Sequence, residues 1–291
     1  MRETKGIYTG VEKWTVCEFE SLKEFYDYIC NQPLNETFRW GELSSSRRSR
    51  DNWYGTSSFN EASDLFKNGW QFGAEELTKK LKIAETQKDV QTTYKNILSM
   101  AGYQAIVPLY LQGVPNNMVN KKIVPVKNKV ITINKTISVS ACVSSETMKA
   151  ESVKCFQIIK KIEQSGIRVN LNLMISTGHV CAKIRLKSAG EKLNISKLAF
   201  PLVHPSMFRR LYFRFIETYP TIPKSYRFGY GRVPNESEFK AVCGKGEIVL
   251  PTLLRGNTEE EISRLSVDEL LEKIELSFLG GQPPLRFLKN I

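Results

Sequence analysis

Apolar residues in the first third of the chain recur at helical spacing, and residues typical of helix ends flank them. Ser21 opens a capping box ahead of the first amphipathic run. Ser58 opens a second, short helix, which Gly69 ends. A third helix is predicted over residues 74–100, with a break near its middle. Residues 31–52 lose the periodicity and carry a run of serines and arginines, so we expect a loop there.

From residue 130 the pattern changes to alternation rich in β-branched residues, which is typical of strands. Strands are predicted at residues 130–140, 167–175 and 180–187, with a long helix between the first two. A strand, a helix and a strand in this order predict parallel pairing within an α/β sandwich. We therefore expect a mainly helical N-terminal region over residues 1–120 and an α/β domain over residues 121–291 that ends in acidic helices.

The predicted strand, the loop SVSACVSSE at residues 138–146, the long helix and the next two strands resemble the first half of a von Willebrand factor A-like domain. From about Trp53 onward, the stretches GTSSFNEASDLFKNGW, GVPNNMVNKK, ISVSACVS and LAFPLVHPSMFRRLYFRFIE resemble an uncharacterised family of phage-encoded proteins with such a core. This resemblance implies a degenerate, incomplete von Willebrand factor A-like sandwich in a phage protein. It implies no activity.

The metal-binding motif of von Willebrand factor A domains is incomplete in this chain. That motif places an aspartate before two serines, because a hard divalent cation needs carboxylate and hydroxyl ligands. Thr136 stands in the aspartate position ahead of Ser138 and Ser140, and no aspartate occurs between Asp89 and Asp268. The six cysteines and two histidines have no spacing that suits zinc. We expect neither a bound metal nor a cofactor.

Positive charge is concentrated in the middle of the chain. The net charge is +12, and residues 101–240 hold 22 lysines and arginines against seven glutamates and no aspartate. Such a region favours polyanions, although a solvated basic surface would give the same composition. Basic residues beside aromatic ones are candidate contacts with nucleic acid or a partner protein. They are Arg47, Arg48, Arg50, Trp53, Tyr54, Lys183, Arg185, Lys224, Tyr226, Arg227, Tyr230 and Arg232.

No sequence motif fixes a reaction. The chain has no nucleophile elbow, P-loop or dinucleotide-binding glycine motif, and His204 and His179 suit a helix entry and a turn. We therefore predict a non-enzymatic phage protein that binds nucleic acid or a nucleoprotein complex. The alternative is an oligomeric protein-interaction factor, such as an inhibitor of a host anti-phage defence complex or a virion component. A homo-oligomer is compatible with both functions.

The expected location is the cytoplasm, which is that of the host cell if the protein is phage-encoded. No window reaches the roughly 18 consecutive apolar residues of a membrane helix. Residues 1–10 lack the hydrophobic run of a secretory signal. No membrane partner is therefore predicted.

Overall fold

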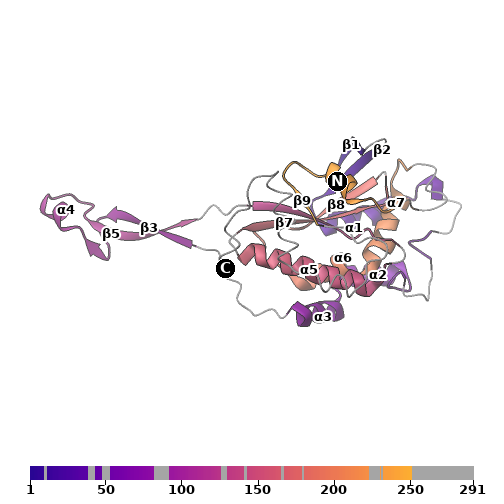
Figure 1. Cartoon of the computed structure of the whole chain (residues 1–291), viewed down its shortest axis with the longest axis horizontal. Helices are drawn as coiled ribbons and strands as arrows, with labels where there is room; N and C mark the ends of the chain where they lie inside the picture. Colours follow the sequence, from indigo (N-terminus) through magenta and orange to yellow (C-terminus); the bar gives the residue numbers. More distant parts are fainter. Residues whose placement is uncertain are drawn as a thin grey trace. The chain divides into compact units, whose positions relative to one another are not determined.

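The computed structural model describes residues 1–9, 12–38, 43–47, 53–81, 92–125, 130–140, 143–164, 167–178, 180–222, 230 and 232–250. The chain divides into two compact units (Figure 1). Unit 1 combines Met1–Ala84 with Val130–Ile291, and unit 2 is Glu85–Lys129. This corrects the expected division at residue 120, because residues before and after unit 2 build one common sheet.

Unit 1 is a mixed α/β fold around a six-stranded sheet in the order β1-β2-β8-β7-β6-β9. Its strands are β1 (Arg2–Thr9), β2 (Glu12–Phe19), β6 (Val130–Thr136), β7 (Arg168–Ser176), β8 (Val180–Lys187) and β9 (Ile248–Val249). β6 and β7 are parallel, as the sequence predicts, and β7 and β8 are antiparallel. β2 pairs with β8 in parallel, and β9 pairs with β6 in parallel.

The N-terminal part of the chain differs from the mainly helical region that was expected. Its first two elements are the strands β1 and β2, which extend the sheet beyond β8. β8 is therefore a central strand with a neighbour on each side. Local alternation cannot distinguish an edge strand from a central one, because pairing partners far away in the sequence decide the position.

Helices cover both faces of this sheet. The helices of unit 1 are α1 (Leu22–Asn31), α2 (Phe59–Asn68), α3 (Gln71–Leu81), α5 (Ser145–Gln164), α6 (Ile195–Val203), α7 (Phe213–Thr218) and α8 (Glu236–Ala241), with a short 3₁₀ turn at Glu36–Phe38 and a π-helical segment at Met207–Tyr212. The main core lies on the face that carries α1, α5 and α6 (Figure 1). A smaller core beneath α8 includes Trp14, Met174 and Phe239 on the opposite face. None of the described helices is long and apolar enough to cross a membrane.

Two buried ion pairs join α5 to the sheet. Lys135 on β6 lies 2.5 Å from Glu151, and Lys187 on β8 lies 2.6 Å from Glu163. Burial raises the pKa of the Glu151 carboxyl, and the Lys135 ammonium partly offsets this rise. A buried charge without its partner is strongly destabilising, so these pairs fix the position of the helix on the sheet.

Unit 2 is a three-stranded sheet in the order β3-β5-β4, with one short helix. Its elements are β3 (Thr92–Ser99), β4 (Gln104–Ala105), α4 (Val107–Leu111) and β5 (Met118–Pro125). β3 and β5 pair antiparallel from Thr92 opposite Pro125 to Ser99 opposite Met118. The predicted third helix is correct over residues 74–81, where α3 forms, and its residues 82–91 lie outside the described residues. Residues 92–99 are a strand, because pairing with β5 outweighs the weak local periodicity.

Candidate binding groove

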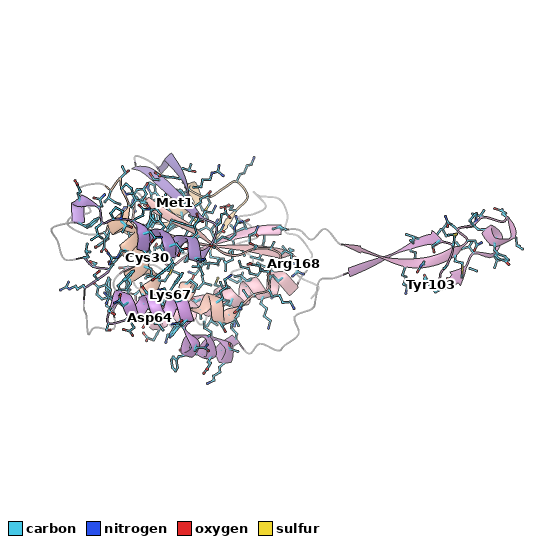
Figure 2. The ribbon with its side chains drawn as sticks, turned by 180° about the vertical axis from the view of Figure 1, so that it is seen from behind. Met1, Cys30, Asp64, Lys67, Tyr103 and Arg168 are labelled. Carbon is cyan, nitrogen blue, oxygen red and sulfur yellow. The ribbon has the colours of Figure 1, made fainter. Side chains whose placement is uncertain are left out.

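A groove of about 640 Å³ opens on the helical side of unit 1. Three segments line it: α1, the junction of α2 with α3, and the start of α6. Figure 2 labels Cys30 on α1 and Lys67 on α2, two of the helices that flank it. Its volume lies within the range of small-ligand sites.

Aromatic rings form the floor of this groove. Tyr26 from α1 stacks on Phe66 from α2, with ring centroids 4.9 Å apart and planes inclined by 16°. Phe66 meets Phe200 from α6 edge to face at 6.1 Å. Trp70 stands edge to face on His204 at 4.7 Å. Tyr26, Phe66 and Trp70 are half-buried, so part of each side chain still reaches solvent.

Lysines surround this aromatic floor. Lys23 on α1, Lys67 on α2 and Lys197 on α6 are all exposed, and Asp27 is the single acidic lining residue among the described ones. The Lys67 ammonium lies 5.3 Å from the centroid of the Tyr26 ring, within cation–π range. The groove therefore presents an excess of positive charge beside ring surfaces.

Two glycines explain why the chain can place Trp70 here. Gly69 has φ = 83°, which ends α2 and turns the chain into α3 as the sequence predicts. A Cβ atom at Gly73 would lie 2.1 Å from the Trp70 ring. The indole therefore packs directly against the first turn of α3, in a space that any larger residue would fill.

Trp53 and Tyr54, two predicted contact residues, pack against buried arginines of the π-helical segment. The Arg209 guanidinium lies 4.5 Å from the Trp53 ring centroid, and that of Arg210 lies 4.0 Å from the Tyr54 ring. Tyr54 is buried, whereas Trp53 is half-buried and packs on the core. Trp53 therefore packs against the interior of unit 1, where the Arg209 guanidinium covers its ring.

These two arginines tie residues 43–47 and residues 53–56 to the core. Arg210 donates from Nη1 to the Ser45 carbonyl at 3.1 Å and from Nη2 to the Thr56 carbonyl at 2.9 Å. Arg209 donates to the carbonyls of Trp53 and Val143. Burial lowers the pKa of the Arg209 guanidinium to about 10. Both cations are committed to the fold.

Most of the other predicted contact residues that the structure describes are also engaged. Lys183 bonds Glu247 at 2.9 Å, Arg185 lies 3.3 Å from Glu20, and Arg232 is paired with Glu238. Tyr230 stacks on Phe213 at 4.4 Å and donates to the buried carboxylate of Glu217. Arg47 is exposed, and its carbonyl accepts from Arg210. Arg48, Arg50, Lys224, Tyr226 and Arg227 lie outside the described residues.

Thr136 and Ser138, two of the residues compared with the von Willebrand factor A metal motif, accept hydrogen bonds from backbone amides through their hydroxyl groups. Thr136 Oγ1 accepts from the amide of Ser138, and Ser138 Oγ accepts from the amide of Ser176 at 2.8 Å. No group of three acidic, histidine or cysteine side chains suited to a metal occurs in the described part of the chain.

A polar cluster on the opposite face contains a thiol beside a carboxylate. The Cys243 sulfur lies 3.3 Å from Asn134 Nδ2, and Glu247 accepts from both Asn134 and Lys183. Burial and the nearby Glu247 carboxylate raise the pKa of Cys243 to about 12. A thiol with so high a pKa is a poor nucleophile, so this cluster joins the sheet to the turn before β9.

Residues 4–277 match the model of a family described as "Domain of unknown function (DUF7192)". The chain belongs to this family. No curated protein and no solved structure matches the chain.

The groove cannot be found from the sequence alone, because its residues are far apart along the chain. Its three lysines come from three helices and are separated by more than forty residues at the closest. A local search for basic residues beside aromatic ones finds neighbours in sequence, whereas the groove gathers neighbours in space. One signal was present, because Lys67 and Trp70 stand together around Gly69.

Proposed function

We propose that the protein is a non-enzymatic nucleic-acid-binding protein that holds single-stranded nucleic acid, alone or within a nucleoprotein complex, in the lysine-rimmed groove. The observation that carries this proposal is the combination of Lys23, Lys67 and Lys197 with the half-buried rings of Tyr26 and Trp70 in one groove. Single strands are bound in this way, with phosphates near cations and bases against aromatic surfaces. The net charge of +12 favours the same class of ligand.

The three lysines supply the predicted salt dependence. Each neutralised phosphate of a single strand contributes roughly −0.7 to the slope of log affinity against log salt concentration. Three phosphate contacts therefore give a slope of about −2. Stacking on the aromatic floor adds affinity that salt does not screen.

Fluorescence anisotropy with a labelled oligothymidine tests the proposal. Lys67→Glu and Lys197→Glu are each expected to weaken binding about tenfold and to make the salt slope shallower by about 1. Lys245→Glu is the matched control, because it makes the same charge change at an exposed lysine outside the groove lining. Absent binding at low salt, or equal losses in the control and in the groove variants, would contradict the proposal.

The fold supports a more specific proposal about ancestry. The strands β8, β7, β6 and β9 follow the order expected of a von Willebrand factor A-like sheet, with β6-α5-β7 as its first parallel unit. We propose a degenerate sheet of that kind in which β1 and β2 extend one side. The phage origin inferred from the sequence stays a prediction.

The alternative function, a protein-interaction factor, is favoured by a different observation. Large apolar side chains are exposed on unit 2. Exposed apolar patches of this kind mark interaction sites. Sedimentation of the purified chain separates the two functions, because a stable multimer that does not bind oligonucleotide supports only the alternative.

A further inference from the structure

Unit 2 shows no interior among its described side chains. None of its described side chains, which cover residues 96–121, is buried. A unit this small cannot bury enough apolar surface to be stable by itself. Its folded form therefore gains from any surface that covers it.

The exposed apolar side chains gather near the end of the hairpin. Large hydrophobic residues with about half or more of their surface exposed occur near the end of β3, in the loop that follows it and in α4. They are Leu98, Met100, Tyr103, Val107, Tyr110 and Leu111, with Met100 at 77% and Leu111 at 78% exposure. We call these six residues the apolar tip. Soluble proteins rarely leave such a set of neighbouring large side chains uncovered without an interaction.

The charge around the apolar tip has one sign. Residues 92–125 contain three lysines and neither aspartate nor glutamate. The ladder of the hairpin places Lys95 opposite Lys122, and Lys121 lies 5.3 Å from the Tyr103 ring. Like charges at opposed positions disfavour strand pairing, and an anionic partner would offset that cost.

Apolar side chains next to lysines distinguish the possible partners. A second copy would bring the same lysines together, and like charges repel. Nucleic acid would satisfy the lysines, but four of the six tip residues are aliphatic and offer no ring for a base. An anionic lipid surface accepts aliphatic side chains among its acyl chains, tyrosines at headgroup level and lysines beside its phosphates.

We propose that unit 2 is a peripheral membrane anchor that inserts its apolar tip into an anionic lipid surface, with Lys121 at the headgroups. This departs from the prediction of no membrane partner, which rested on the search for a spanning segment. A surface anchor needs no such segment, because shallow burial of a few side chains and attraction to anionic headgroups suffice. Unit 1 keeps its groove for a separate ligand.

Co-sedimentation of the full chain with vesicles tests this proposal. Vesicles of phosphatidylcholine with phosphatidylserine should bind the protein, and vesicles of phosphatidylcholine alone should bind it at least about tenfold more weakly. Replacing Met100 and Leu111 by serine should lower partitioning at least about tenfold. Gln112→Ser is the matched control at an exposed polar position beside Leu111, and it should bind like the wild type.

A second readout reports insertion directly. In a Tyr110→Trp variant, the fluorescence emission of the new tryptophan should shift to shorter wavelength on anionic vesicles. The wild-type signal is subtracted first. Circular dichroism of each variant checks folding, which exposed positions should leave intact. Three outcomes would overturn the proposal: no binding to anionic vesicles, binding unaffected by the two serine substitutions, or a lipid-free dimer that those substitutions abolish. The last outcome would assign the apolar tip to a second copy.

Discussion

Two sets of cations in unit 1 behave in opposite ways. Arg209 and Arg210 are buried, stack on aromatic rings and donate to backbone carbonyls. Lys67 and Lys197 are exposed on the rim of a groove. The net charge therefore includes buried cations that no ligand can contact. Only cations that the fold leaves at the surface of a concave site are available to bind a polyanion.

The largest effect is expected where a buried carboxylate loses its cation. Lys135→Met leaves Glu151 buried without its ammonium, so we expect the free energy of unfolding to fall by about 3–5 kcal/mol. Combining it with Glu151→Leu should recover most of the loss, because an apolar pair of similar volume replaces the ion pair. Urea denaturation measures both variants. A double variant no more stable than the single one would show that packing, not charge, causes the loss.

Removal of a buried arginine should have the next largest effect. Arg210→Met leaves the carbonyls of Ser45 and Thr56 without their donor, and each unsatisfied buried group costs about 1–3 kcal/mol. We expect a loss of about 3 kcal/mol in unfolding free energy. Arg185→Met is the contrasting control, since its exposed ion pair with Glu20 contributes at most about 1 kcal/mol. Similar losses of unfolding free energy in the two variants would contradict the distinction between buried and exposed cations.

His204 connects the two regions, because it supports Trp70 in the groove and follows α6 into the arginine segment. Burial lowers its pKa to about 4, and its Nδ1 accepts from the amide of Ser206 at 3.2 Å, as a neutral ring can. The unfolded chain takes up this proton near pH 6.5, so the stabilisation is present above that pH and is lost as pH falls toward 4.

The expected loss from His204 is about 2 kcal/mol between pH 7 and pH 5. His204→Gln should flatten this part of the stability curve, whatever its effect at pH 7. Denaturation series at several pH values compare the two slopes. An unchanged slope in the variant would assign the acid sensitivity to other groups. The buried carboxyl of Glu217 is not one of them, because burial raises its pKa and its contribution has the opposite sign.

Several features of the fold followed from the sequence because they depend on neighbouring residues. The helices that begin after Ser21 and Ser58 are capped by hydrogen bonds to these serine side chains from amides three residues later. The helix before Gly69 ends because this glycine has a positive φ. The β6-α5-β7 order followed from the change of hydrophobic period, and parallel pairing followed from the length of the connection. The absence of an aspartate before Ser138 can likewise be read directly from the sequence.

The site depended on contacts that local patterns do not encode. Arg210 bonds the Thr56 carbonyl across 154 positions of the chain, and this contact removes an apparently available cation from the surface. Lys183 and Tyr230 are engaged in the same way by Glu247 and Glu217. Residues 92–99 became a strand only through the ladder with β5.

The caps, the order of strands and helices in the α/β part and the excess of positive charge can all be deduced from the sequence. The tertiary structure alone decided which cations are buried, that three lysines from three helices share a groove with Tyr26 and Trp70, and that the residues on both sides of unit 2 build one sheet. The physical reason is that caps and periodicity arise from interactions within a few residues. Burial arises from packing between segments that are distant in the chain.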